Sequence, residues 1–348
     1  MFNDGYSIGG EFQISPSFFN VKNYNDNKDK KAFSSGRSAF RAILKEARKL
    51  GFNEIWLPNY ICDTVPASAL QERFALKWYE IEPNFHIKLR ELQKFPNKPF
   101  LILLVDYFGM LDLSSEVSEL HKAGAVICID KIQALYESDS FGADYWFYGF
   151  RKFLPIPEGA FAFSRNEMII PPQLESDVGT LKVLAGLIKN IAYSYSLCDE
   201  AYLNLFNMSE QRLDCQEEIT STGPLFPLML SSIDIEEAKV KRQKNYEILS
   251  NMLQEYGIQQ LKSPEKKHCS PLAIPIAIQN RDAIRKYLIS KHIYLPVHWP
   301  QKQPQGFASF LAEHELSLII DQRYTAEDMM NMVRSLVDAK VKTISYDC

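Results

Sequence analysis

The chain has 348 residues and a formal net charge of −4, and 46 % of its residues are apolar while 24 % are charged. This balance is typical of a globular protein with two domains, or with one large domain and an appendage. It argues against a nucleic-acid-binding protein, which would carry a concentrated basic patch, and against a membrane span, because the most apolar run, PFLILLVDYFG, is too short.

The first two thirds of the chain alternate helical and strand-like segments. Apolar spacing predicts helices in SGRSAFRAILKEARKLG, DTVPASAL and LSSEVSELHKAG, and an amphipathic helix over 178–197. Strands are predicted in EIWLP, ALKWYEI, FLILLVDY, AVICID, DYWFYGF and GAFAFS. AVICID lacks polar alternation, as expected for a strand covered on both faces. The order predicts an α/β fold with a mostly parallel central sheet.

The pattern changes near residue 234. A long charged helix, DIEEAKVKRQKNYEILSNMLQEYG, precedes LAIPIAI, a helix at 281–291, the segment IYLPVHWP and a last helix from about Thr325. These segments predict a smaller α+β domain. We place the division so that residues 1–240 form the large domain and residues 241–348 form the small C-terminal domain.

The cysteines and histidines indicate neither a metal site nor a disulfide framework. Six cysteines are scattered without CxxC spacing, six histidines are equally dispersed, and no HExxH pair occurs. The N-terminus, MFNDGYSIGG, has no secretory signal. We therefore expect a cytoplasmic protein with free thiols.

Asp130 is the first candidate for chemistry. It ends the apolar strand AVICID, and ligands of open α/β sheets gather at the carboxyl ends of strands. A carboxylate in such a place is costly unless it is paired. Two interpretations stay open, namely a cap or structural ion pair, and a partner for a cation. Gln133 follows three residues later and can reach the same space.

The segment SSGRSAF precedes the first clear helix. Ser34, Ser35 and Gly36 offer backbone N–H groups at a helix N-terminus, and Arg37 adds a positive charge. This combination favours a phosphate site. Simple helix capping by serine explains the same residues, so the segment alone does not decide between them.

Lys152 lies in FYGFRKFLPIPEG, among aromatic and apolar residues and directly after Arg151. Burial and a neighbouring cation both lower the pKa of a lysine, and a neutral lysine is a nucleophile toward carbonyls. The alternative is an ordinary solvated lysine. A phosphate site, a carboxylate and a reactive lysine, in this chain order, are what pyridoxal phosphate requires.

The sequence resembles the DegT/DnrJ/StrS family of sugar aminotransferases, which are fold-type-I pyridoxal-phosphate enzymes. The resemblance covers nearly the whole chain. It follows eight segments in order: IGGEF, SGRSAF, LPNYICDTV, DYFGMLD, CIDKIQAL, GFRKFLPIPEG, LPVHWP and DQRYTAEDM.

The resemblance implies roles for individual residues. Lys152 matches the lysine that holds the cofactor as a Schiff base, Asp130 the acid that contacts the pyridine nitrogen, and Gln133 the residue that hydrogen-bonds the ring hydroxyl. The positions that meet the cofactor phosphate in the family are here Gly36, Arg37 and Ser38.

The resemblance also implies a function and an assembly. It implies a homodimer whose large domain binds pyridoxal 5′-phosphate and whose C-terminal part closes over the substrate. The amino donor would be glutamate, and the acceptor a nucleotide-linked keto sugar used in polysaccharide or cell-surface sugar biosynthesis.

Several positions depart from the family pattern. Phe147 stands where the family often has a phosphate-binding serine, and Asp106 replaces a histidine. Cys62 aligns with the aromatic residue that stacks on the cofactor ring, and Tyr60 is the candidate to replace it. STGPLFPLML occupies the region of the family's Asn/Arg segment that crosses the dimer.

Two other functions are considered. A sugar dehydratase of this family carries histidine in place of the lysine, so Lys152 argues against it. A non-catalytic or regulatory protein of the same fold is favoured by the altered residues around the site. His298 and Trp299 either line the substrate entrance or serve in packing.

Overall fold

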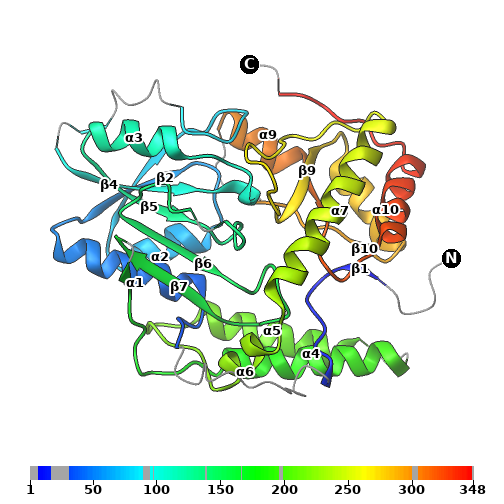
Figure 1. The fold of residues 1–348 in the computed structure, drawn as a ribbon, viewed down its shortest axis with the longest axis horizontal. Helices are drawn as coiled ribbons and strands as arrows, with labels where there is room; N and C mark the ends of the chain where they lie inside the picture. The colour runs from blue at the N-terminus through cyan, green and yellow to red at the C-terminus, as the bar shows by residue number, and fades with distance from the viewer. Residues whose placement is uncertain are drawn as a thin grey trace.

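The protein is described by a computed structural model that covers residues 7–16, 31–88, 95–96, 98–137, 139–165, 167–195, 199–299 and 305–346. Its larger part is built on seven strands: β2 (Glu54–Pro58), β3 (Ala75–Tyr79), β4 (Phe100–Val105), β5 (Ala125–Asp130), β6 (Tyr145–Gly149), β7 (Ala160–Ser164) and β8 (Glu167–Met168). They form one sheet in the order β3-β2-β4-β5-β6-β7-β8, and Figure 1 labels its strands β2, β4, β5, β6 and β7.

The sheet is mostly parallel. β3, β2, β4, β5 and β6 run parallel to one another, and β7 and β8 return antiparallel at one edge. Every residue of β4 is buried, which explains its continuous apolar run. The predicted α/β fold with a mostly parallel sheet is confirmed.

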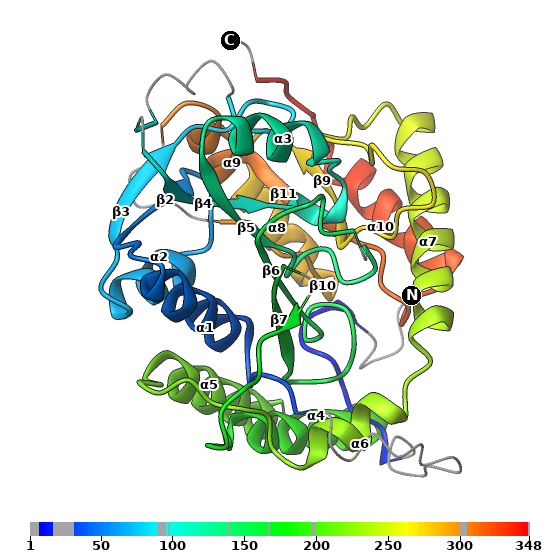
Figure 2. The same cartoon turned by 60° about the vertical axis from the view of Figure 1, so that its left-hand side comes forward.

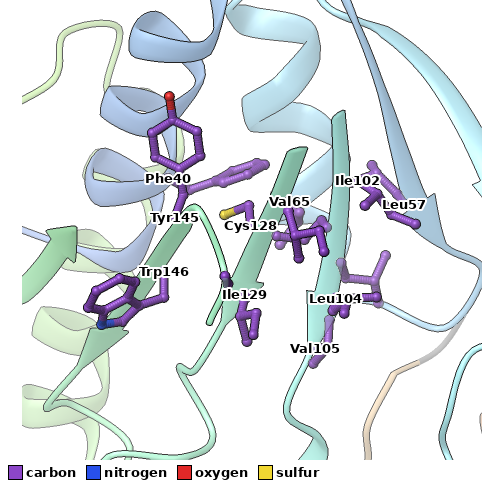
Figure 3. Packing of buried hydrophobic residues seen from close by; sticks show 14 of the residues in the cluster. Phe40, Leu57, Val65, Ile102, Leu104, Val105, Cys128, Ile129, Tyr145 and Trp146 are labelled. Atoms are coloured by element: carbon purple, nitrogen blue, oxygen red, sulfur yellow. The ribbon is translucent and has the colours of Figure 1, made fainter. Parts of the chain in front are cut away.

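Helices cover both faces of the sheet: α1 (Gly36–Lys49) and α2 (Thr64–Gln71) lie on one face, and α3 (Ser114–Lys122) lies on the other (Figure 2). The apolar stripe of α1 is buried against the sheet. Figure 3 shows Phe40 of α1 and Val65 of α2 among the buried side chains of β4 and β5. This packing fixes the N-terminus of α1 at the carboxyl edge of the sheet.

Three helices form a layer below the sheet in Figure 1: α4 (Val178–Tyr195), α5 (Glu200–Asp214) and α6 (Leu225–Ser231). The predicted amphipathic helix over 178–197 is confirmed as α4. It packs on α5 through Ala185, Ala192, Tyr202 and Phe206. None of the helices in the described part of the chain has the length and apolarity to cross a membrane.

The smaller part follows α7 (Ile235–Glu255) and contains β9 (Ala273–Ala277), α8 (Arg281–Ser290), β10 (Ile293–Tyr294), α9 (Phe307–His314), β11 (Glu315–Ile319) and α10 (Ala326–Asp338). β9 and β11 pair antiparallel. The N-terminal strand β1 (Ile8–Gly9) pairs in parallel with β10. The division at residue 240 falls inside α7 and stays a prediction.

Gly9 shows why the N-terminal strand can join the smaller part so closely. Its φ is +97°, and a Cβ placed there would lie 2.1 Å from the carbonyl oxygen of Tyr294. Only glycine fits that approach. Ile8, beside it, is buried in the hydrophobic core of the smaller part, so both ends of the chain contribute to one core.

Because β4 lies in the core of the sheet, we expect a cavity made in this strand to lower the free energy of unfolding strongly. Ile102→Ala removes a side chain with 0 % exposure, so we expect the free energy of unfolding to fall by about 2–5 kcal/mol. The matched control is Ile170→Ala, whose side chain is 74 % exposed and should change stability by less than about 0.5 kcal/mol. Chemical denaturation measures both, and equal losses in the two variants would contradict the assignment of β4 to the core.

Candidate active site

A cavity of about 170 Å³ lies at the carboxyl ends of β5 and β6, where α1 begins. We call it the first cavity. Of the residues predicted for the site, six line it together: Gly36, Arg37, Cys62, Asp130, Gln133 and Lys152. Two predicted residues, Tyr60 and Ser38, are not among its lining residues. The folded chain therefore gathers segments that are more than one hundred residues apart in sequence.

Asp130 is the last residue of β5 and is buried. Its Oδ1 accepts a hydrogen bond of 2.8 Å from the N–H of Ile132. Burial raises the pKa of this carboxyl group to about 6, while the Ile132 N–H and the charge of Lys152 act in the opposite direction. The carboxylate thus ends an apolar strand with a cation as its electrostatic partner.

Lys152 follows β6 and is half-buried. Burial lowers the pKa of its ammonium group; Cys62 and Asp130 act in the opposite direction, and Arg151 lowers the pKa further. Its Nζ lies 5.8 Å from the ring centroid of Trp299. A lysine with a lowered pKa is more easily present as the neutral amine, which is the nucleophilic form.

Gln133 presents an unused donor to the first cavity. Its side chain is buried, and its Oε1 accepts a hydrogen bond of 2.9 Å from the N–H of Phe108. Its Nε2 has no partner among the described residues. Because a buried amide donor is costly to leave unpaired, this atom indicates a ligand with an acceptor oxygen at that point.

The N-terminus of α1 forms one end of the first cavity. Ser35 caps the helix by accepting a bond of 3.2 Å from the N–H of Ser38. A Cβ at Gly36 would lie 2.6 Å from the Ile132 side chain, so glycine permits the close approach of α1 to the loop after β5. Free N–H groups and the helix dipole make this end suitable for an anion.

The cations beside that end are paired with acidic residues of α5. Arg37 contacts Asp214 at 2.5 Å, and Arg151 contacts Glu210 at 2.6 Å. Buried Lys182, which also lines the first cavity, forms an ion pair with the same Glu210. The sequence analysis did not single out Lys182 or the two acids, because nothing in the local sequence places α5 beside the start of α1.

Cys62 shares the wall of the first cavity with an aromatic residue from the C-terminal third of the chain, Trp299. Cys62 lines the first cavity, and its Sγ lies 3.2 Å from the hydroxyl oxygen of Thr64. Tyr60 is fully buried behind it, donates a hydrogen bond to the carbonyl oxygen of His298, and packs on Trp299 with ring centroids 5.1 Å apart. Trp299 itself lines the first cavity.

Two positions that depart from the family pattern, Phe147 and Asp106, are both buried in the structure. Phe147 lines the first cavity and stacks on Phe40 with ring centroids 5.5 Å apart, so an apolar wall stands where a donor was expected. Asp106 is fully buried and accepts a 3.2 Å bond from the N–H of Leu111. Burial raises the pKa of Asp106 to about 7, against the effect of that N–H and of Lys131.

Glu158 is a buried carboxyl group on the wall of the first cavity that the sequence analysis did not consider. Its Oε1 accepts a 3.1 Å bond from the N–H of Gly223, and its Oε2 has no partner among the described residues. Burial raises the pKa of Glu158 to about 7. In the sequence, Glu158 follows the apolar segment PIP, and no local pattern there indicates a buried carboxyl group.

Lys152 and Arg151 also line a second cavity, of about 490 Å³, that extends toward the smaller part. His298 lines it too. Its Nδ1 lies 2.9 Å from the Ser317 hydroxyl oxygen, which donates a 2.5 Å hydrogen bond to the carboxylate of Glu315. Since that hydroxyl proton goes to Glu315, the Ser317 oxygen accepts from Nδ1–H, and the lone pair of a neutral His298 lies on Nε2.

No group of three or more histidine, cysteine or acidic side chains suited to a metal ion occurs in the part of the chain that the structure describes. Four cysteines of that part are free thiols: Cys62, Cys128, Cys215 and Cys269. Cys198 and Cys348 lie outside the described residues.

Comparison with known proteins identifies the fold. An aminotransferase of pseudoaminic acid biosynthesis from Helicobacter pylori superposes with a TM-score of 0.67 and 15 % identity, covering 96 % of this chain and 99 % of that one. The chain has the fold of an aminotransferase. A DegT/DnrJ/EryC1/StrS aminotransferase from Brucella abortus gives a TM-score of 0.63 at 13 % identity, over 89 % of this chain and 85 % of that one.

The name of a third similar structure mentions a cofactor, PLP. A chain from Streptococcus pneumoniae, named as a sugar aminotransferase and solved in its PLP form, gives a TM-score of 0.63 at 13 % identity, over 95 % of this chain and 93 % of that one. No family model matches the chain, and no curated protein sequence matches it. The likeness therefore confirms the predicted fold.

Asp106 predicts a pH dependence of stability. Its pKa rises from 3.8 to about 7 in the fold, so the folded state keeps a proton that the unfolded state releases, and stability falls as the pH rises from about 4 to about 7. Asp106→Asn should abolish the contribution of Asp106 to this loss of unfolding free energy, which is on the order of 4 kcal/mol at most. Urea denaturation at both ends of the window measures it.

The control for this measurement is Asp282→Asn on α8, where the carboxylate is 86 % exposed. That variant should keep the wild-type dependence on pH. If Asp106→Asn and wild type lose the same stability across the window, Asp106 is not protonated in the folded protein.

Proposed function

We propose that this chain is a pyridoxal-phosphate-dependent aminotransferase of the DegT/DnrJ/StrS type. The observation that carries the proposal is the pairing of Lys152 with Asp130 across one buried cavity at the carboxyl edge of the sheet. A lysine that loses its proton easily and a buried carboxylate opposite it are the two groups that this cofactor needs at its aldehyde and at its ring nitrogen.

The other residues of the first cavity fit the same cofactor. The unpaired Nε2 of Gln133 would donate to the ring hydroxyl, and the N-terminus of α1 at Gly36 and Arg37 would receive the phosphate. When bound, pyridoxal phosphate supplies an electron-poor ring that delocalises the electron pair of a broken C–H bond. Asp130 would keep the ring nitrogen protonated.

Lys152 has the part of the general acid and base in this proposal. Its neutral amine would take the proton from the substrate carbon and hold it for return, which is efficient when the pKa of the amine is near the working pH. Burial lowers its pKa in that direction. The apolar walls, among them Phe147 and Trp299, exclude water from this proton transfer.

Trp299 is our candidate for the aromatic contact with the cofactor ring. It lines the first cavity, whereas Tyr60 is buried behind it and holds the carbonyl oxygen of the preceding residue. The thiol of Cys62 cannot stack as an aromatic ring does. In this arrangement Tyr60 positions Trp299, and Trp299 replaces the stacking group that Cys62 lacks.

Substrates and assembly extend the proposal beyond the cofactor. We propose glutamate as the amino donor and a nucleotide-linked keto sugar as the acceptor, in polysaccharide or cell-surface sugar biosynthesis. The sugar-related names of similar structures support this substrate class. A cytoplasmic homodimer remains part of the proposal, and exposed apolar side chains on α4 and α5 support the dimer: Leu184, Ile191, Tyr195, Leu203 and Met208.

A non-catalytic or regulatory protein is the second candidate. Phe147 removes a phosphate donor, and Arg37 is already paired with Asp214. These two observations favour weaker cofactor binding. The two candidates differ in one measurable property, because only an aminotransferase releases 2-oxoglutarate from glutamate when the cofactor is present.

Lys152→Ala tests the proposed function. Wild-type protein incubated with pyridoxal phosphate should show a visible absorption band from cofactor bound covalently to lysine, and it should release 2-oxoglutarate from glutamate. The variant should lose the band, and its rate of 2-oxoglutarate release should fall at least about 10²-fold. It lacks both the covalent link and the proton-transfer group. The control is Lys122→Ala, with 68 % exposure on α3.

Three results bear on the two candidates. A band in wild type without amine transfer would favour the regulatory protein. A band that survives in Lys152→Ala would show that another amine holds the cofactor. Loss of the band in Lys122→Ala as well would mean that the effect does not depend on the cavity.

Trp299→Ala tests the aromatic contact. We expect the dissociation constant for pyridoxal phosphate to rise by about two- to tenfold, as for loss of one stacking pair, while Trp299→Phe keeps most of the affinity. The matched control is Trp78→Phe on β3, whose side chain is 47 % exposed. Absorbance titration measures the affinity, and an unchanged value in Trp299→Ala would remove Trp299 from the cofactor site.

A further inference from the structure

The second cavity carries an excess of positive charge. Five basic side chains line it, and only two acidic ones do. The basic residues are Arg151, Lys152, Arg242, Arg285 and Arg323, and the acidic residues are Glu11 and Asp321. The volume of about 490 Å³ falls within the range of small-molecule sites. Excess cationic charge in a concave, partly buried space favours an anionic ligand.

Two of the five cations are already neutralised by carboxylates. Arg323 contacts Asp321 at 2.7 Å and also donates to it from Nε. Arg151 contacts Glu210 at 2.6 Å. These pairs form part of the wall. The charge of Lys152 is opposed by Asp130 in the first cavity, which leaves Arg242 and Arg285 as the lining cations without an ion pair in the described chain.

Arg242 is a fully buried cation of α7. Its guanidinium group donates to the carbonyl oxygens of Pro271 and Leu272, at 2.9 and 2.7 Å, and to the side chain of Gln322 at 3.3 Å. Its Nε has no partner among the described residues. Neutral acceptors leave the charge uncompensated, and burial lowers the pKa of this group even though Asp321 acts against that shift.

A buried guanidinium group without a bound carboxylate is unusual, because buried charges are normally paired. Within the described residues no carboxylate lies within 4.0 Å of Arg242 or of Arg285. An anion in the second cavity would supply the missing countercharge.

Arg285 is placed to contact such an anion directly. It lies on α8 of the smaller part, and its Nε donates a hydrogen bond of 3.1 Å to the carbonyl oxygen of Leu295. That bond fixes the side chain over the cavity that it lines. Its two terminal nitrogens have no partner in the described chain, and a guanidinium group presents them as a fork suited to a carboxylate or phosphate.

We propose that the second cavity binds an anionic oxygen group of the substrate, a carboxylate or a phosphate, between Arg285 and Arg242 and next to Lys152. The assignment to a substrate rests on the proposed function, because Lys152 lines both cavities. Anion binding itself depends only on the charges of the second cavity. The cofactor would thus approach Lys152 from α1 and the substrate from α8.

Arg285→Gln is the decisive variant, since Arg285 is exposed and its replacement should not disturb folding. Glutarate is the first probe, as a dicarboxylate without an amino group, and uridine diphosphate is the second, as a nucleoside diphosphate without a sugar. Calorimetry on the cofactor-loaded protein should find binding of at least one probe. Arg285→Gln should weaken that binding by about tenfold or more.

The matched control is Lys286→Gln, which makes the same charge change on the same helix at an exposed residue that does not line the cavity. It should alter binding by less than about twofold, as expected for a screened surface charge. Arg285→Lys should restore part of the affinity, since it keeps the charge but loses the bidentate contact.

The two probes identify the source of the anion. Binding of glutarate alone that depends on Arg285 assigns the cavity to the carboxylate of an amino donor. Binding of uridine diphosphate alone assigns it to the phosphates of a nucleotide-linked acceptor. Wild-type affinity in Arg285→Gln, an equal loss in Lys286→Gln, or no binding of either probe to the wild type would overturn the proposal.

The visible band of the wild type, recorded beside the same titration, separates this inference from the proposed function. If the wild type incubated with pyridoxal phosphate never forms the band, but glutarate or uridine diphosphate still binds through Arg285, the proposed function fails and the anion site stands. If the band forms and neither probe binds, the anion site fails while the cofactor proposal stands.

Discussion

The burial of Lys152 opposite Asp130 is the interaction on which the site depends. A carboxylate at the end of an apolar parallel strand and an amine directly after the next strand are each costly alone, and each shifts the pKa of the other toward its charged form. The parallel order of β5 and β6 brings the two groups to one edge of the sheet. The neighbouring walls, from the start of α1 to Trp299, are arranged around this pair.

The charges around the pair are distributed unevenly between the two cavities. On the side of α1, acidic residues of α5 neutralise Arg37, Arg151 and Lys182, so the N–H groups of the helix are the principal free donors there. On the side of α8, Arg242 and Arg285 have no carboxylate of their own within the described chain. The same lysine thus separates a space with balanced charge from one with excess positive charge.

Aromatic packing brings two distant segments of the chain together at the wall of the first cavity. The loop after β2 places a thiol, Cys62, on the wall of the first cavity. Tyr60 lies behind it and holds the segment that ends in Trp299, and Glu315 holds the N–H of His298 in the same segment at 2.7 Å. Two residues from distant elements thus contact the segment whose indole lines the first cavity.

The sequence by itself predicted the alternating helices and strands from α1 to β7 and the candidates Asp130, Gln133 and Lys152, because apolar periodicity and a polar residue at the end of a buried strand are local signals. It did not predict α5, α6, α9, β8 or β11. The tertiary structure decided that Trp299, and not Tyr60, lines the cavity, that Glu210 and Asp214 neutralise the cations beside α1, and that Arg242 lacks a carboxylate partner. Those facts depend on contacts between residues tens to hundreds of positions apart. No local pattern specifies such contacts, since the countercharge or ring that a side chain meets is set by how whole layers pack.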